Sequence, residues 1–127
     1  MAKILIADDE INLQNLIKTV LEEGKHQVLT VTRGSDVIAA LQREKPDLLI
    51  LDVMLPAMDG LSLQKIIAQD PALRAVPIIV ITAQKAFLGM FSAFPQVAAK
   101  LEKPFTMQTL IATVDSILNR KQSPAVQ

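Results

Sequence analysis

Residues 47–60 read DLLILDVMLPAMDG, and this stretch decides how the rest of the chain is interpreted. Its apolar run, residues 48–51, lies between two segments rich in turn-forming residues. A short apolar run bounded by turn signals is typical of a strand that is covered on both faces, as in a parallel sheet. The run ends on Asp52. The sequence therefore predicts a buried strand that presents a carboxylate at its carboxyl end, the edge at which open α/β sheets bind ligands.

Strand and helix patterns alternate along the remainder of the chain. Further apolar runs predict strands at residues 3–7, 28–31, 78–81 and 97–101. Apolar residues at helical spacing predict helices over residues 13–21, 37–41, 63–67 and 107–118, with a shorter helix inside residues 83–99. This alternation is typical of a parallel five-stranded sheet with helices on both faces. The residue pattern alone leaves the order of the strands in the sheet open.

Composition limits the class of protein. The length of 127 residues suits one domain, which we expect over residues 1–121, with a flexible tail over residues 122–127. Lys plus Arg and Asp plus Glu both number 13, so the net charge is zero and neither direct nucleic-acid binding nor an anionic membrane surface is expected. There is no Cys, no signal peptide and no apolar run of the ~20 residues that span a bilayer. We expect a soluble, cytoplasmic protein without membrane insertion.

Polar residues follow the predicted strands and suggest a reaction. Asp8 and Asp9 follow the first strand, Asp52 the third, Thr82 the fourth and Lys103 the fifth. Carboxylates that crowd together at one sheet edge share protons or bind a cation, and Mg²⁺ prefers such oxygen ligands. A bound cation and the ammonium of Lys103 could neutralise the charge of a phosphoryl group, and the hydroxyl of Thr82 could donate a hydrogen bond to it. The sequence therefore predicts Asp52 as a nucleophile that forms an acyl phosphate.

Four motifs in this order closely resemble the receiver domain of two-component response regulators. They are Asp8-Asp9, LDVMLPAMDG at residues 51–60, Thr82-Ala83 and Lys103-Pro104-Phe105, and they span nearly the whole chain. The resemblance implies a flavodoxin-like, doubly wound five-stranded parallel sheet of order 2-1-3-4-5 with five helices. We expect a stand-alone regulator similar to those of chemotaxis, because no output domain follows residue 121.

The resemblance also implies the phosphoryl donor and the metal ligands. Asp52 would accept its phosphoryl group from a histidine kinase or a histidine phosphotransfer protein. Asp9 and Asp52 would be direct Mg²⁺ ligands, and Asp8 would act mainly through a water. The backbone carbonyl of Met54 would complete the ligands supplied by the protein.

The resemblance further implies that two residues carry the response to phosphorylation. Lys103 would pair with the phosphoryl oxygens, and its peptide bond to Pro104 is expected to be cis. Thr82 would move toward the phosphoryl group and change the surface formed by the fourth helix, fifth strand and fifth helix. That surface would control a downstream protein target.

The chain departs from the receiver pattern on that same surface. Lys100 occupies the position, three residues before Lys103, where the family usually has an aromatic residue. Lys100 would therefore point outward toward an acidic partner. An apolar segment nearby would form either a docking patch, including a phosphorylation-dependent homodimer contact, or part of the core; its residues are Phe87, Leu88, Met90, Phe91 and Phe94.

Two other functions remain as alternatives. A phosphatase with an aspartyl nucleophile needs a second acid two residues after the nucleophile, and that position holds Met54. The sequence therefore predicts a phosphoacceptor that at most catalyses its own phosphorylation and dephosphorylation. The missing aromatic residue favours the other alternative, an adaptor that keeps the receiver fold and works independently of phosphorylation.

Overall fold

The computed structural model of the chain describes residues 2–55, 59–92 and 94–121. Residues 56–58 of the turn-rich segment that follows Asp52, and the tail predicted over residues 122–127, lie outside these residues. The strands are β1 (Lys3–Ala7), β2 (Gln27–Val31), β3 (Leu48–Asp52), β4 (Ile78–Thr82) and β5 (Val97–Glu102). The helices are α1 (Ile11–Glu23), α2 (Val37–Glu44), α3 (Gly60–Gln69), α4 (Lys85–Leu88) and α5 (Met107–Lys121), with short 3₁₀ turns η1 (Gly34–Asp36) and η2 (Gly89–Phe91).

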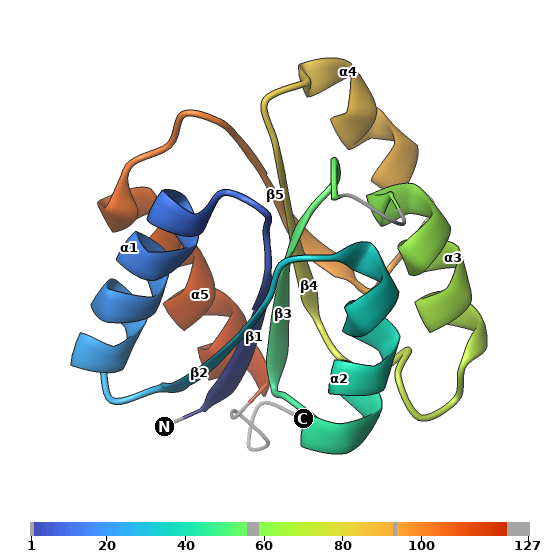
Figure 1. Cartoon of the computed structure of the whole chain (residues 1–127), viewed down its shortest axis with the longest axis horizontal. Coiled ribbons are helices and arrows are strands. Elements are labelled where there is room, and N and C mark those ends of the chain that lie inside the picture. Colours follow the sequence, from blue (N-terminus) through green and yellow to red (C-terminus); the bar gives the residue numbers. More distant parts are fainter. Residues whose placement is uncertain (1, 56–58, 93, 122–127) are drawn as a thin grey trace.

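All neighbouring strands of the sheet run parallel, in the order β2-β1-β3-β4-β5. This order confirms the expected flavodoxin-like architecture. Every residue of β3 and β4 is buried, because helices cover both faces of the sheet there. The carboxyl ends of the strands lie at the upper edge of the sheet in Figure 1, where the loops to the helices begin.

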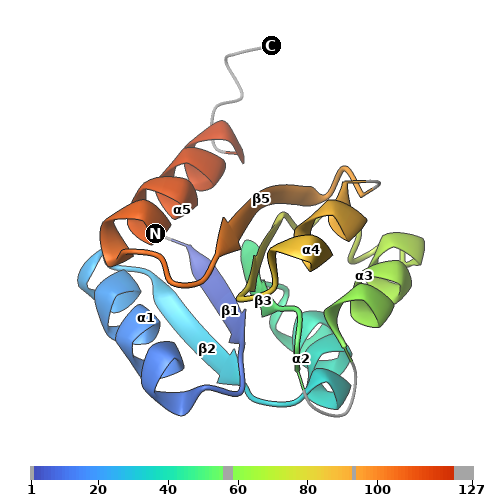
Figure 2. The same cartoon turned by 90° about the horizontal axis from the view of Figure 1, so that it is seen from above.

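The helices form one layer on each face of the sheet, as both views show (Figures 1 and 2). Helices α1 and α5 cover one face, and α2, α3 and α4 cover the other. Successive residues of β3 alternate between the two cores: Leu48 and Ile50 pack with α1 and α5, whereas Leu49 and Leu51 pack with α2 and α3. The continuous apolar run that identified this strand therefore fills two cores at once.

The start of α3 is held close to the end of β3. Asp59 caps the helix, because its Oδ1 accepts a hydrogen bond from the backbone N–H of Ser62 at 2.9 Å. The N–H of Gly60 donates to the carbonyl oxygen of Val53 at 2.7 Å. A Cβ atom on Gly60 would lie 2.8 Å from the Cα of Val53, a distance that real side chains avoid. Glycine at this position therefore lets α3 approach the backbone that follows Asp52.

The apolar segment after β4 packs mainly into the core. Helix α4 has four residues and continues directly into η2. Phe91 is 1% exposed, and Phe87, Leu88 and Phe94 pack partly buried against the cluster of α2 and α3. Met90 is 49% exposed. The docking-patch hypothesis is therefore wrong for Phe91, and of the five residues considered only Met90 is a clearly exposed large side chain.

Helix α5 begins directly after the fifth strand's loop. The hydroxyl oxygen of Thr106 accepts a hydrogen bond from the backbone N–H of Thr109 at 3.0 Å, which is the contact of an N-cap. Leu110 and Val114 of this helix are fully buried against α1 and the sheet. The cap and this packing fix the start of α5 and so the loop that carries Lys103.

Candidate functional site

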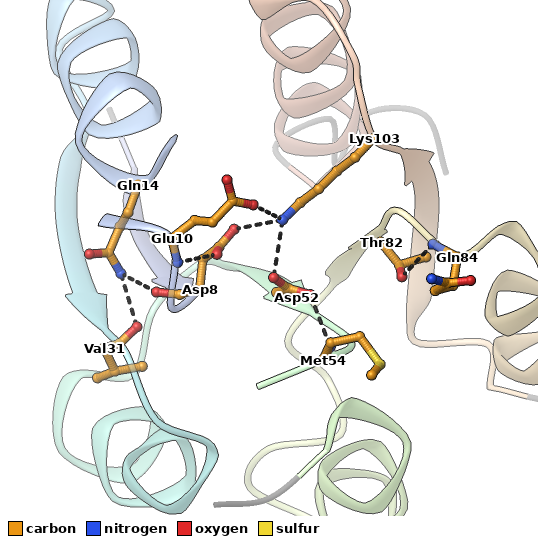
Figure 3. A network of polar contacts seen from close by, with 9 residues as sticks. All are labelled: Asp8, Glu10, Gln14, Val31, Asp52, Met54, Thr82, Gln84 and Lys103. Atoms are coloured by element: carbon orange, nitrogen blue, oxygen red, sulfur yellow. Dashed lines mark hydrogen bonds and ion pairs between the residues drawn. The ribbon is translucent and has the colours of Figure 1, made fainter. Parts of the chain in front are cut away.

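The predicted site residues come from four neighbouring strands. Asp8 follows β1, Asp52 ends β3, Thr82 ends β4 and Lys103 follows β5. Because the strands are parallel, their carboxyl ends meet at one edge of the sheet. In Figure 3 the side chain of Lys103 reaches across this edge and ends between Asp8 and Asp52. The structure therefore brings the acids and the lysine together as the sequence predicts.

Three carboxylates form a cluster that could hold a metal ion. One oxygen from each of Asp8, Asp9 and Asp52 lies within 4.8 Å of the others. Asp8 and Asp52 are buried, whereas Asp9 is exposed. Backbone N–H groups orient the two buried acids: Met54 donates to Asp52 Oδ1 at 2.9 Å, and Glu10 donates to Asp8 Oδ1 at 2.8 Å. The exposed acid leaves one side of the cluster open to solvent.

Asp8 is the most deeply buried acid of the cluster. Its side chain is fully buried, and burial together with the nearby Asp52 raises the pKa of Asp8 from 3.8 to about 6. Its Oδ2 accepts no hydrogen bond from the part of the chain that the structure describes. A buried carboxylate oxygen without a donor is costly unless a cation binds it. The cluster is thus chemically suited to a hard divalent cation such as Mg²⁺.

Lys103 supplies the positive charge of the site. Its Nζ lies 2.8 Å from Glu10 Oε1, 3.1 Å from Asp52 Oδ2 and 3.5 Å from Asp8 Oδ2. Burial alone would lower the pKa of Lys103, but its hydrogen bond to Glu10 and the charges of Asp52 and Asp8 outweigh burial and raise it. Lys103 therefore stays protonated at neutral pH. Its peptide bond to Pro104 is cis, which confirms the expectation from the sequence.

Thr82 has no direct contact with the acids. Its side chain is fully buried, and its Oγ1 accepts a hydrogen bond from the backbone N–H of Gln84 at 3.0 Å. Among the described residues, no hydrogen bond joins Thr82 to Asp52. Figure 3 shows Thr82 and Gln84 beside each other, apart from the network around Lys103. The structure thus places Thr82 at the carboxyl end of β4, and its hydroxyl oxygen accepts a hydrogen bond from the loop that leads into α4.

Two residues of the site were missed by the sequence analysis. Glu10 binds Lys103, and the signal for it was the third acid of the run at residues 8–10. Gln14 is buried, and its Nε2 donates to the carbonyl oxygens of Asp8 at 3.1 Å and Val31 at 2.9 Å. A polar residue on the inner face of α1 offered only a weak signal. Both residues connect α1 to the strand ends that carry the site.

A surface pocket of about 420 Å³ opens beside Lys103. The residues that line it come from the β1–α1 region, the β4–α4 loop and the β5–α5 loop; they are Glu10, Leu13, Ala83, Lys103, Pro104 and Phe105. Apolar side chains therefore surround the lysine on its outer side. This arrangement gives a small molecule or a partner's side chain access to Lys103 and Glu10.

Lys100 lies away from the site, on β5. Its side chain is exposed, as the sequence predicts, and its Nζ donates a hydrogen bond to Ser92 Oγ at 2.8 Å. Ser92 directly follows η2. The side chain that replaces the usual aromatic residue therefore connects β5 to the end of the α4 region.

The described part of the chain contains no helix that is both long and apolar enough to cross a membrane.

Comparison with known sequences identifies relatives of this chain. A family described as "Response regulator receiver domain" matches residues 4–115. Protein PilH of Pseudomonas aeruginosa is 31% identical over 119 residues, which cover 93% of this chain and 98% of PilH. The transcriptional regulatory protein GltR of the same organism is 37% identical over 125 residues, which cover 98% of this chain and 52% of GltR. The chain thus spans nearly all of PilH but about half the length of GltR.

Solved structures show the same similarity in three dimensions. A putative response regulator from Chloroflexus aurantiacus is 31% identical, with a TM-score of 0.82 over 92% of this chain and 97% of that one. Chemotaxis response regulator CheY4 of Vibrio cholerae is 27% identical, with a TM-score of 0.84 over 92% of this chain and 98% of that one. The chain therefore belongs to the response regulator receiver domains of two-component signal transduction, which are phosphoacceptors rather than enzymes in the usual sense.

Proposed function

We propose that Asp52 accepts a phosphoryl group from the phosphohistidine of a histidine kinase or a histidine phosphotransfer protein. Membership of the receiver family implies a cognate histidine kinase. The observation that carries the proposal is the contact of 3.1 Å between Asp52 Oδ2 and Lys103 Nζ, beside two further carboxylates. A carboxylate is a suitable nucleophile toward phosphorus, and the lysine ammonium offsets the charge of the phosphoryl oxygens.

The same cluster supports Mg²⁺ as the cofactor. Asp8, Asp9, Asp52 and the backbone carbonyl of Met54 would hold the ion. These are the hard oxygen ligands that Mg²⁺ prefers, and the buried Asp8 Oδ2 has no hydrogen-bond donor among the described residues. When bound, the ion supplies positive charge that offsets the carboxylates and the phosphoryl oxygens.

Each residue of the site has a separate role in the phosphoryl transfer. A bond forms between a carboxylate oxygen of Asp52 and phosphorus, while the bond from phosphorus to the donor's imidazole nitrogen breaks and that nitrogen keeps the electron pair. The N–H of Met54 holds the acceptor carboxylate in place during this step. Lys103 donates hydrogen bonds to the phosphoryl oxygens. The positions of these groups, and the charge they compensate, provide the catalysis.

Phosphorylation would then change the surface formed by α4, β5 and α5. Thr82 exchanges its hydrogen bond with Gln84 for one to the phosphoryl group and draws the β4–α4 loop toward the site. A movement of this loop reaches η2 and Ser92, which the hydrogen bond from Lys100 joins to β5. The resulting surface binds or releases a downstream protein, and it could also join two copies of the chain.

One observation favours a second function, that of a phosphorylation-independent adaptor. Lys100 stands where the family usually has the aromatic partner of the switch, and its side chain is committed to Ser92 at 2.8 Å. An adaptor would keep one surface in both states. Phosphorylation of Asp52 would then be absent or without effect on the partner.

Measurement of intact mass after incubation with acetyl phosphate and Mg²⁺ tests the proposal. We expect one phosphoryl adduct on the wild type and none on Asp52→Asn, because the amide is not a nucleophile. Asp115→Asn, which removes an equal charge from an exposed position on α5, serves as the matched control and should be labelled like the wild type.

A chelator in the same assay tests the cofactor. Labelling should be lost in its presence, because the three carboxylates then repel an approaching phosphoryl dianion. Labelling that continues in chelator would contradict the role of Mg²⁺. No adduct on the wild type under any condition would favour the adaptor.

A further inference from the structure

The side chain of Glu10 contacts Lys103 and not the helix that it precedes. Glu10 is the N-cap residue of α1, yet its side chain makes no capping hydrogen bond. The short polar side chains that are preferred at this position, those of Ser, Thr, Asp and Asn, accept a hydrogen bond from a backbone N–H of the first helical turn. Instead, Glu10 Oε1 lies 2.8 Å from Lys103 Nζ, which is 93 positions away along the chain. Glu10 is thus directed toward the reacting groups rather than toward its own helix.

The ammonium of Lys103 is surrounded by carboxylates before any phosphoryl group arrives. It carries three N–H donors. Three carboxylates lie around it, with Glu10 at 2.8 Å, Asp52 at 3.1 Å and Asp8 at 3.5 Å. Two of its N–H donors form hydrogen bonds, to Glu10 and Asp52, whereas Asp8 Oδ2 accepts none from the described residues. A phosphoryl oxygen that approaches Lys103 therefore meets the charges of all three carboxylates and competes with Glu10 and Asp52 for its hydrogen bonds.

The three carboxylates differ in burial, and therefore in how easily each can move away from Lys103. The side chain of Asp8 is 0% exposed and that of Asp52 is 6% exposed, whereas the side chain of Glu10 is 61% exposed. Only Glu10 can turn into water without leaving a buried charge behind. Glu10 also lines the pocket that opens beside Lys103, so its charge lies where that lysine is open to solvent.

We propose that Glu10 is a positioning residue that competes with the incoming phosphoryl group for Lys103 and so sets the rate at which Asp52 is phosphorylated. This inference rests on the proposed role of Asp52 as the phosphoacceptor. With Glu10 in place, one N–H of Lys103 is bound to a carboxylate other than the phosphoacceptor. The carboxylate of Glu10 also repels an anionic donor that approaches Lys103.

The competition acts at a defined point of the reaction with acetyl phosphate. A bond forms between a carboxylate oxygen of Asp52 and phosphorus, the bond from phosphorus to the acetyl oxygen breaks, and acetate leaves with the electron pair. As the phosphoryl group approaches, the N–H of Lys103 that is hydrogen-bonded to Glu10 Oε1 breaks this hydrogen bond and forms one to a phosphoryl oxygen. Removal of the Glu10 charge weakens its hydrogen bond with Lys103 and so makes this exchange easier.

The test compares labelling rates of the wild type and Glu10→Gln at saturating Mg²⁺ with two small donors. Glutamine keeps the length of the side chain but removes its charge. We expect the rate with acetyl phosphate to rise roughly tenfold, as for the removal of one unit charge several ångströms from an incoming dianion. The rise with phosphoramidate, which carries less negative charge, should be smaller.

Two further variants separate this role from a structural one. Glu23→Gln removes the same charge from an exposed position at the far end of α1, and its rates should equal those of the wild type. Glu10→Asp keeps a charge near the entrance but shortens the side chain, so that Lys103 is released. Its rate should lie between those of the wild type and Glu10→Gln. Circular dichroism shows that each variant is folded before its rate is measured.

The outcomes distinguish this inference from the function on which it rests. A wild type that acquires no adduct would overturn the role of Asp52, and the inference with it. A labelled wild type with an equal rate for Glu10→Gln would overturn the inference alone. An equal acceleration with both donors would also overturn it, since competition between negative charges must depend on the charge of the donor.

Discussion

Replacement of Asp8 by asparagine should stabilise the metal-free protein at neutral pH. Burial first, and the charge of Asp52 as well, raise the pKa of Asp8 from 3.8 to about 6 in the folded protein. Between these pH values the folded protein binds more protons than the unfolded chain. Its stability therefore falls as the pH rises through this window and stays lower above it. Asparagine keeps the oxygen that accepts the backbone N–H of Glu10 and carries no charge at any pH in this range.

The size of the effect follows from the shift in pKa. A change from 3.8 to about 6 corresponds to roughly 3 kcal/mol of unfolding free energy once Asp8 is fully ionised. About 2 kcal/mol of this should develop between pH 4.5 and 7.5. In a domain of this length, ~3 kcal/mol corresponds to a change in Tm of roughly 10 °C.

Urea unfolding followed by circular dichroism measures this difference. The chain has neither Trp nor Tyr, so fluorescence is a poor probe. Both proteins are measured in chelator at several pH values from 4.5 to 7.5, and the difference in free energy should widen as the pH rises. A difference that stays constant over this range would refute the ionisation argument. Addition of Mg²⁺ should stabilise the wild type more than Asp8→Asn, because the ion binds the ionised acid.

Three further substitutions, two of them paired with a control variant, are tested by the same unfolding assay. Gly60→Ala should lower the unfolding free energy by about 2 kcal/mol, since its Cβ would lie 2.8 Å from backbone, whereas Gly89→Ala, with open space around its Cβ, should not destabilise. Phe91→Ala should lower it by about 3–5 kcal/mol because Phe91 is 1% exposed, and Met90→Ala, at a position 49% exposed, by less than about 0.5 kcal/mol. Thr106→Ala should lower it by about 1 kcal/mol through loss of the α5 cap, and an unchanged value would show that the hydrogen bond to Thr109 contributes little.

The strands and the four strand-end motifs could be predicted because their signals are local. Residues 48–51 and 78–81 are apolar without interruption, and burial on both faces follows from such a run wherever it lies in a parallel sheet. The acids after β1 and β3 and the lysine after β5 could then be assigned to one edge, since parallel strands place their carboxyl ends together. The strand order came from the resemblance to receiver domains and not from these patterns.

The α4 region shows where local patterns fail. The segment from Phe87 to Phe94 is apolar nearly all round, so that helical periodicity could not separate a buried side from an exposed one. The structure buries Phe91 and exposes Met90, its direct neighbour. That choice depends on how the short helix and η2 lie against α3 and the sheet, which is a matter of packing between elements distant in sequence.

The sequence by itself determined the architecture and the identity of the reacting groups: a strand ending on Asp52, with further acids and Lys103 at neighbouring strand ends. Only the tertiary structure decided which polar side chains contact one another at this edge of the sheet. It placed Glu10 at 2.8 Å from Lys103, closer than Asp52, and turned the buried Gln14 toward two strand-end carbonyls. The physical reason is that hydrophobic patterns report which face of an element is buried, whereas contacts between long polar side chains depend on the positions of several loops and strand ends at once.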